Sequence, residues 1–576
     1  MTDLGSFNLH RANLVIETLL AQGVKYFCLS PGSRSTPLML AISKLPKELI
    51  CVHFDERGLG FHALGFAKAS NSPVAILVTT GTAVANLLPA VAEASASKIP
   101  LIILSADRPP ELRDCGANQT MDQVALFKPF TKWDVDLAFS DPLASDAYLI
   151  SSIAYAANQS RKGPVQVNCM IREPLFSLEE EECKKNPKKL NNPSCFYEPV
   201  ISLPPMSSFK NWAEILMSYE KGIILLGEGA IENNPSPLLA LAKKLGWPIF
   251  SSVLSGGRQI GTHPFHMEYP DLFLKANPDV KADVVLQIGG SIVSKTVTKW
   301  ISSQKDLLHF LVTDHPSRQD PEHNISYRME CTGELFCHVL DGFVQVRQTP
   351  WISFWKTGSE IIKKELSSFF LSNNKFSEPA LLYFLKDVPY LFLSNSMPIR
   401  DADLFNVGSL FASANRGISG IDGNIATATG IATALKKPLV AVLGDLASLH
   451  DLNSLALLKK SSTPIFFIII NNQGGGIFSF LPISEQTEIF EELVATAHEY
   501  SFEFIAKTFS LPFYEADSLE AWETAWEKAL QQNTSCIIEC HTKREDNVSN
   551  HEEIYTRIKA SLCSSPLPLE SLMISP

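Results

Sequence analysis

Oxygen-bearing side chains follow two consecutive apolar segments in the last third of the chain. Asp445 ends one segment, "PLVAVLGD", and Asn471 and Asn472 end the next, "PIFFIIINN", with Gln-Gly-Gly-Gly directly after them. If both segments are parallel strands, their carboxyl ends meet at one edge of a sheet. A carboxylate, an amide oxygen and a glycine carbonyl at that edge form a hard-oxygen site that suits Mg²⁺ bound to a phosphate. Gly and Asn are also common in ordinary strand-end turns, so either motif alone leaves both interpretations open.

A carboxylate pair near the start of the chain raises a choice between chemistry and capping. The segment "CVHF" is followed by Asp55 and Glu56, and a glycine-rich helical segment begins at once. Acids in a first helical turn are favoured by the helix macrodipole, which predicts a capping role. The carboxyl edge of a parallel sheet is also where such folds keep their active sites, which predicts a buried general acid or base. Residues 53–65 alone favour capping.

These groups can meet only if the chain folds into parallel sheets, and its apolar segments alternate with helical lengths throughout. Segments such as "VKYFCLSPG", "PVAILVTTG" and "ADVVLQIGG" are separated by runs long enough for a helix. This alternation predicts βαβ units, an α/β fold and strands covered by helices on both faces. We predict three doubly wound parallel-sheet domains at 1–185, 200–345 and 350–545, with a charged linker at 177–194 and a polar C-terminal tail at 546–576.

Composition excludes several classes of function. The chain has 576 residues, 45% of them hydrophobic and 19% charged, and its net charge of −12 argues against nucleic acid and membranes as partners. No apolar run reaches the roughly 18 residues that a membrane-spanning helix needs. The first residues lack a secretion signal, and the eleven cysteines include no Cys-x-x-Cys pair. We therefore expect a cytoplasmic protein with reduced thiols, without zinc or disulfides.

The Gly-Asp and Asn-Asn motifs resemble the diphosphate-binding signature of thiamin-diphosphate-dependent enzymes. Further motifs resemble one branch of that family, the menaquinone-pathway transferases that join 2-oxoglutarate to isochorismate. These motifs are "SPGSRSTPL" (30–38), "HFDERGLG" (53–60), "TTGTAVANLLPA" (79–90), "ADRPPELRDCGANQ" (106–119), "NRGISGIDG" (415–423), "GDLASLHDLN" (444–453) and "NNQGGGIFSFLP" (471–482). The resemblance covers both outer domains, whereas the middle domain matches mainly by its place in the chain. It implies pyrimidine-binding, central and diphosphate-binding domains, in that order.

The resemblance implies thiamin diphosphate and Mg²⁺ as cofactors, with Mn²⁺ as a substitute for the metal. It assigns the metal to Asp445, Asn472 and the carbonyl of Gly474. It gives Glu56 a catalytic contact with the aminopyrimidine ring, which leaves the capping role to Asp55. Ile421 would support the bent cofactor, although a core isoleucine would look the same in the sequence. The implied cofactor residues are Glu56, Ile421, Gly444, Asp445, Leu446, Asn472, Gly474 and Ile477.

Both implied substrates are dianions, so an acidic protein must gather positive charge locally. Arginine forks suit bidentate binding of carboxylates, although a lone arginine is more often a surface ion pair. The implied isochorismate residues are Ser33, Arg34, Arg108 and Gln119. The implied residues for the oxoglutarate-derived part are Ser396, Arg400 and Arg416. Other implied substrate contacts are Lys295 and an apolar wall of Phe478 and Leu481, which could equally be core.

The middle domain departs from the pattern of the family at one point. The family often offers a Lys-Arg pair to the substrate, whereas here Lys295 is followed by Thr296. The missing guanidinium would cost about 1.5–3 kcal/mol if it made a charged hydrogen bond. Lys299 can compensate only if this segment is a helix. The same segment, "GGSIVSKT", differs from a P-loop only by Ser294 in place of glycine, which makes an NTPase a poor interpretation.

The resemblance places Glu56 and Asp445 at one site across two subunits, which predicts at least a homodimer and allows a tetramer. The alternatives are another thiamin-diphosphate-dependent 2-oxoacid decarboxylase or carboligase, and a catalytically silent paralogue. The arginines of "PGSRSTPL" and "ADRPPELRDCGANQ" favour a substrate with several carboxylates. A silent protein would be expected to lose the glutamate or the metal ligands, and this chain keeps both.

Overall fold

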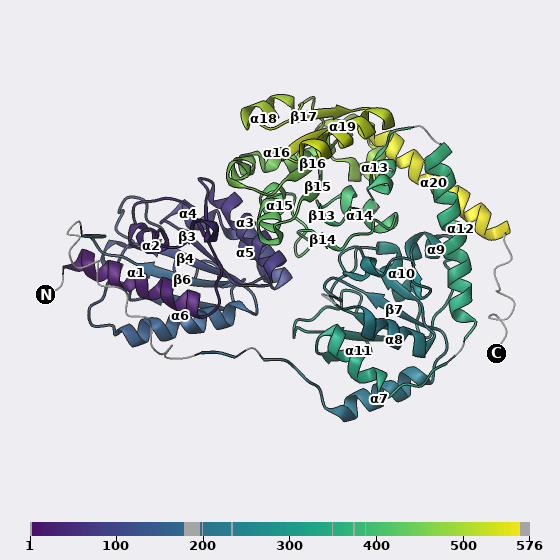
Figure 1. Cartoon of the computed structure of the whole chain (residues 1–576), viewed down its shortest axis with the longest axis horizontal. Helices are drawn as coiled ribbons and strands as arrows, with labels where there is room; N and C mark the ends of the chain where they lie inside the picture. The colour runs from purple at the N-terminus through teal and green to yellow at the C-terminus, as the bar shows by residue number, and fades with distance from the viewer. Residues whose placement is uncertain are drawn as a thin grey trace.

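The computed structural model describes residues 3–177, 196–198, 200–231, 234–347, 349–372, 375–385 and 388–564. Nearly all of the predicted linker at 177–194 lies outside these residues. The described residues form three six-stranded sheets in which every strand pair is parallel, so the predicted α/β fold is confirmed (Figure 1). None of the helices in this part of the chain has the length and apolar character needed to cross a bilayer.

The two outer sheets share one strand order, and the middle sheet has another. The N-terminal sheet contains, in spatial order, β2 (Ile50–Val52), β1 (Tyr26–Leu29), β3 (Val74–Val78), β4 (Leu101–Asp107), β6 (Val165–Met170) and β5 (Trp133–Leu137). The C-terminal sheet contains β14 (Phe411–Ser413), β13 (Tyr390–Leu393), β15 (Leu439–Gly444), β16 (Ile465–Asn471), β18 (Cys536–His541) and β17 (Phe513–Ala516). The middle sheet contains β12 (Tyr327–Glu330), β11 (Leu308–Thr313), β10 (Val284–Ile288), β7 (Gly222–Leu226), β8 (Ile249–Ser251) and β9 (His266–Met267).

Each sheet carries an apolar cluster on both faces, because helices cover both sides. The N-terminal helices are α1 (Leu4–Ala21), α2 (Thr36–Ile42), α3 (Glu56–Ser70), α4 (Thr82–Ala85), α5 (Leu88–Ser97) and α6 (Asp146–Ser160). The middle helices are α7 (Met206–Met217), α8 (Ser236–Leu245), α9 (Pro270–Ala276), α10 (Lys295–Ser302) and α11 (Gly333–Asp341). The later helices are α12 (Trp351–Ser372), α13 (Glu378–Phe384), α14 (Met397–Leu404), α15 (Asn424–Leu435), α16 (Asp445–His450), α17 (Thr487–Ile489), α18 (Glu503–Thr508), α19 (Leu519–Gln532) and α20 (Arg544–Ser564).

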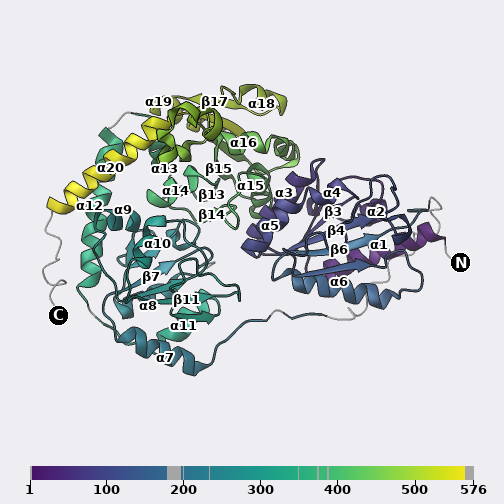
Figure 2. The same ribbon diagram turned by 180° about the vertical axis from the view of Figure 1, so that it is seen from behind.

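The outer domains pack directly on each other through α3 and α15, which lie side by side in Figures 1 and 2. A Cβ added at Gly65 would overlap the backbone of Thr427, and one added at Gly430 would overlap the carbonyl of His62. The helices therefore touch backbone to backbone, which only glycine permits. His62 Nδ1 and Thr429 Oγ1 add a buried hydrogen bond of 2.8 Å across this contact.

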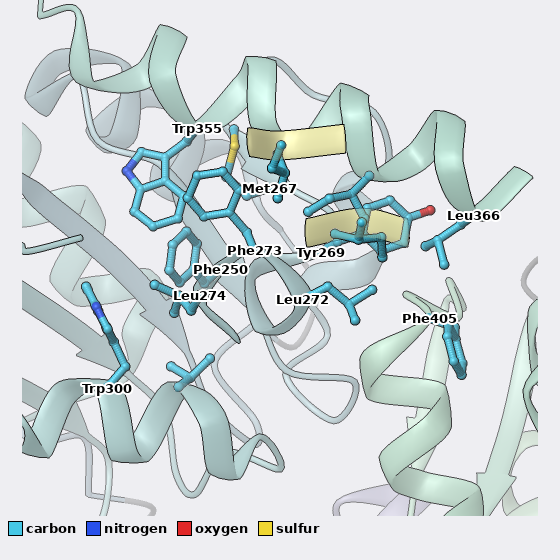
Figure 3. Packing of buried hydrophobic residues seen from close by; sticks show 14 of the residues in the cluster. Phe250, Met267, Tyr269, Leu272, Phe273, Leu274, Trp300, Trp355, Leu366 and Phe405 are labelled. Carbon is cyan, nitrogen blue, oxygen red and sulfur yellow. The ribbon is translucent and has the colours of Figure 1, made fainter. Parts of the chain in front are cut away.

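A second interface joins the middle and C-terminal domains. Figure 3 shows Phe250 and Phe273 of the middle domain packed with Trp355 of α12, and Tyr269 beside Leu366 of the same helix. The cluster extends to Phe405 of the C-terminal domain. Although α12 opens the predicted third domain, much of its apolar face is therefore covered by the middle domain.

The predicted polar tail at 546–576 is wrong for its described part. Residues 546–564 continue α20, whose Ile554, Ile558 and Leu562 are buried in the same cluster. These residues recur every four positions and so lie on one face of the helix. Because many charged residues lie between these three, the composition of the segment did not predict its apolar face.

Candidate active site

The predicted metal-binding groups lie together at the carboxyl edge of the C-terminal sheet. β15 and β16 are neighbours, with Gly444 in register with Ile470, so Asp445 and Asn472 extend from adjacent strands. The buried Asp445 carboxylate accepts hydrogen bonds from the backbone nitrogens of Gly474 (2.9 Å) and Leu446 (2.6 Å). Gly474 has a φ of +145°, a value that favours glycine, and a Cβ there would lie 2.6 Å from the carbonyl oxygen of Ala495.

One oxygen at this edge is buried without a partner. The Nδ2 of Asn472 donates to Glu378 at 2.8 Å, and its Oδ1 has no hydrogen-bond partner among the described residues. Burial also raises the pKa of Asp445, so the native fold disfavours the bare carboxylate. A divalent cation would satisfy the Asn472 oxygen and offset the Asp445 charge. The residues present therefore fit the implied Mg²⁺.

Two residues beside this edge were missed in the sequence. Glu378, the first residue of α13, is buried against Asn472, and burial raises its pKa to about 8. His498 lies with its Nε2 3.4 Å from Asp445 Oδ2, and both side chains are buried. Glu378 and Asn472 are 94 positions apart, so no local pattern could have connected them.

Positive charge gathers at the end of β13, next to the metal-binding groups. The Oγ of Ser394 accepts from the Gly444 nitrogen at 3.3 Å and so joins the two strand ends. Arg400 donates to the Ser396 carbonyl, and Arg416 donates to Asn395 Oδ1 at 3.2 Å. Burial, followed by the charge of Arg416, lowers the pKa of Arg400.

Ser396 adopts a strained backbone at this site. Its φ is +73°, an unusual value for a residue other than glycine. Strain of this kind persists only where the surroundings hold it, and it gathers at functional sites.

The predicted apolar contacts lie on or near the surface. Ile421 is 39% exposed, so its interpretation as a core isoleucine is wrong. Leu446, Ile477 and Phe478 are half-buried, and Leu481 is 45% exposed. These side chains are available to contact a bound molecule.

Two of the predicted isochorismate residues meet in the N-terminal domain, at the carboxyl ends of β3 and β4. Arg108 donates to Thr80 Oγ1 at 3.2 Å, and Gln119 donates to the Thr80 carbonyl at 3.1 Å. Ser33 is exposed in the loop after β1. The strand order of this sheet reverses between β1 and β3, which is where such sheets bind ligands.

Arg34 is buried and already has structural partners. It donates to the Ile171 carbonyl at 2.9 Å and to Glu173 at 2.8 Å. Burial lowers its pKa, and the nearby charge of Arg108 acts in the same direction. Arg34 therefore lies near Arg108, and its guanidinium is already bonded to Glu173.

The first residue of the carboxylate pair has the capping role. Asp55 caps α3, because its Oδ1 accepts from the nitrogens of Arg57 (3.0 Å) and Gly58 (3.3 Å). Glu56 is half-buried at the start of the same helix and accepts from Ser30 Oγ at 3.2 Å. Its predicted meeting with a cofactor held by another copy stays a prediction.

The segment around Lys295 is a helix. Lys295 opens α10, and Lys299 lies one turn later, with both residues exposed. The helical condition for compensation by Lys299 is therefore met. Ser294 caps this helix by accepting from Val297 N at 3.0 Å.

Comparisons with known proteins identify the family of the three domains. Three sequence profiles match in order: "Thiamine pyrophosphate enzyme, N-terminal TPP binding domain" at 10–126, "Middle domain of thiamine pyrophosphate" at 195–390, and "Thiamine pyrophosphate enzyme, C-terminal TPP binding domain" at 406–540. The solved structure of benzoylformate decarboxylase from Polynucleobacter necessarius matches with a TM-score of 0.71 over 93% of this chain and 98% of that chain. At 15% identity this match shows a shared fold.

Curated relatives narrow the family further. The 2-succinyl-5-enolpyruvyl-6-hydroxy-3-cyclohexene-1-carboxylate synthase of Rubrobacter xylanophilus is 36% identical, over 94% of this chain and 96% of that protein. The synthase of the same name from Shewanella frigidimarina is 37% identical, over 94% of this chain and 97% of that protein. The chain therefore belongs to the 2-succinyl-5-enolpyruvyl-6-hydroxy-3-cyclohexene-1-carboxylate synthase family of thiamin-diphosphate-dependent enzymes.

Proposed function

We propose that this protein decarboxylates 2-oxoglutarate and adds the resulting four-carbon unit to isochorismate, with thiamin diphosphate and Mg²⁺, in cytoplasmic menaquinone biosynthesis. The observation that carries this proposal is the placement of Arg400 and Arg416 at the end of β13. They lie beside the hard-oxygen groups that end β15 and β16. This placement supports a metal-diphosphate site and a carboxylate-binding site at one sheet edge.

In this proposal, the C-terminal domain holds the cofactor through its metal. Asp445, Asn472 and the Gly474 carbonyl bind Mg²⁺, for which Mn²⁺ can substitute. Gly444, Leu446, Ile421 and Ile477 contact the cofactor. When bound, thiamin diphosphate supplies the carbanion chemistry for decarboxylation and transfer.

Substrate binding falls to the two groups of cationic and polar residues. Ser396, Arg400 and Arg416 bind the carboxylates of the oxoacid, because paired guanidinium groups suit a dianion. Their partial burial strengthens the attraction, since water screens it less.

The N-terminal residues Ser33, Arg34, Arg108 and Gln119 bind isochorismate. Lys295 and Lys299 supply charge from the middle domain, and Phe478 and Leu481 form the apolar wall.

Glu56 is the catalytic residue in this proposal, and it acts on a cofactor held by a second copy. It holds a proton at the aminopyrimidine ring, while Asp55 caps the helix. The protein is then at least a homodimer. Light scattering of the purified chain measures this directly, and a monomer that is fully active would contradict the shared site.

The test of the reaction is CO₂ release from 2-oxoglutarate by the purified protein with thiamin diphosphate and Mg²⁺. Release is expected to depend strongly on isochorismate. Equal release with and without isochorismate would mean a simple decarboxylase. Glu56→Gln is expected to abolish release and to keep cofactor and metal binding, and an unchanged rate would remove Glu56 from the mechanism.

A further inference from the structure

A buried ion pair of the N-terminal domain lies under the loop that carries Arg416. Lys68 comes from α3 and Glu93 from α5, and their side chains are 7% and 1% exposed. Their charged atoms are 3.4 Å apart. Residues this polar are rarely so buried unless other groups satisfy them, and here the C-terminal domain supplies those groups.

The pair holds the backbone on both sides of Arg416. Glu93 accepts from the nitrogens of Gly417 (2.9 Å) and Ile418 (2.8 Å), one with each carboxylate oxygen. Lys68 donates to the Ala414 carbonyl at 2.6 Å and to Asn415 Oδ1 at 3.3 Å. Hydrogen bonds to charged groups are about twice as strong as neutral ones.

Asn395 holds the same loop from the C-terminal domain, because its Nδ2 donates to the carbonyls of Asn415 and Gly420, both at 2.7 Å. Residues 414–420 lie between β14 and α15, outside any helix or strand. Ser97 of α5 donates to Glu93 at 2.8 Å, and a Cβ at Gly417 would lie 2.6 Å from that hydroxyl. The loop therefore sits directly on α5, and its close fit requires glycine.

The Arg416 side chain itself is less constrained than its backbone. It donates to Asn395 at 3.2 Å and is half-buried. The direction of its guanidinium therefore depends on Asn395 and on the backbone, which Lys68 and Glu93 hold from the N-terminal domain and Asn395 holds at the Asn415 carbonyl.

We propose that Lys68 and Glu93 are positioning residues, through which the N-terminal domain sets Arg416 for the oxoacid carboxylate. This inference rests on the proposed function of Arg416. It gives the pyrimidine-binding domain a second role, toward the substrate site of its own chain. The pair acts through Arg416, so its loss changes oxoacid binding more than the chemical step.

The experiment compares the full-length protein with Glu93→Gln and Lys68→Met, in the presence of thiamin diphosphate and Mg²⁺. KM for 2-oxoglutarate is expected to rise at least about tenfold in each variant, the size of one weakened charged hydrogen bond. KM for isochorismate and kcat should stay within about threefold. Glu503→Gln is the matched control, because it breaks an exposed ion pair of 2.7 Å with Lys507 and touches no site residue.

We call the hydrogen bonds from Lys68 and Glu93 to the backbone around Arg416 the clamp. Hydrogen–deuterium exchange of the peptide around Gly417 tests the clamp without measuring the reaction. Glu93→Gln should speed exchange of the Gly417 and Ile418 amides about tenfold or more, and Glu503→Gln should leave it unchanged. If exchange does not change, the clamp is refuted whatever reaction the protein performs. If exchange rises but the two KM values move together, Arg416 positioning is refuted. A wild type that does not consume 2-oxoglutarate refutes the proposed function, and the exchange result still decides the clamp. If Glu93→Gln fails to fold, Lys68→Met provides the same two measurements from the other side of the loop.

Discussion

Replacing Glu378 with glutamine should stabilise the protein at neutral pH. Burial raises the pKa of Glu378 to about 8 from 4.5. Below the lower value both folded and unfolded chains hold the proton, so the contribution of Glu378 to stability is fully present. As the pH rises toward 8, the unfolded chain ionises and the folded chain does not, which costs about 1.4 kcal/mol per pH unit. Glutamine does not titrate, so the free energy of unfolding of Glu378→Gln does not carry this cost. The difference in unfolding free energy between the variant and wild type should therefore rise by about 3 kcal/mol from pH 5.5 to pH 7.5.

The assay is urea unfolding of the cofactor-free protein at both pH values. A three-domain chain need not unfold in one step, so the quantity compared is the variant-minus-wild-type shift of the first transition. Glu503→Gln controls for the loss of an exposed carboxylate and should stay within about 0.5 kcal/mol. Glutamine can still accept from Asn472, so Mg²⁺ affinity should be kept. A variant-minus-wild-type difference that is the same at pH 5.5 and 7.5 would mean that Glu378 is already ionised in the folded protein at both values, and would refute the reasoning.

Other substitutions test the metal site, the domain contact and the cofactor support. Asp445→Asn removes the metal-site charge and should weaken Mg²⁺-dependent thiamin diphosphate binding at least about 30-fold in a fluorescence titration, equivalent to about 2 kcal/mol; affinity that chelation of the metal does not change would contradict the assignment. Gly430→Ala forces a Cβ against the His62 carbonyl and should lower the free energy of unfolding in urea by about 2–3 kcal/mol. Gly342→Ala is the control that should be tolerated, because its Cβ would lie 3.4 Å from its nearest contact. Ile421→Ala should lower kcat about 10–100-fold in the CO₂ assay and leave the thermal midpoint within about 2 °C, because the side chain is 39% exposed; a large fall in the midpoint would make it a packing residue.

The residues that meet at the sheet edges were predictable, because strands joined by helix-length connections are parallel and end at the same edge. Once "PLVAVLGD" and "PIFFIIINN" are parallel neighbours, Asp445 and Asn472 must end at one edge, and β15 and β16 are such neighbours. The apolar runs alone predict this, since strands buried on both faces need helical crossovers. The family motifs predict substrate and cofactor roles for side chains around the ends of β13 and β3, and these roles stay predictions.

Contacts between distant segments could not be predicted from the sequence. Glu378 meets Asn472, and Glu93 meets Gly417, across 94 and 324 positions, and nothing in the local pattern of either residue indicates its partner. In the sequence, a buried carboxylate on a helix cannot be distinguished from an exposed one unless its partner is known. Arg34 shows the opposite case, because its motif predicts substrate contact while the fold also gives it Glu173.

The packing of α3 on α15 sets an order of events on the ribosome. The end of α3 and the start of α15 are separated by about 350 residues, including the whole middle domain. At about 5–20 residues per second, α3 is complete roughly 20–70 s before α15 is made. During that time α15 cannot cover the face around His62 and Gly65, although the rest of the N-terminal core is synthesised within the first 100 residues of the interval. A chain stopped before residue 424 lacks α15 and so leaves this face without its partner helix.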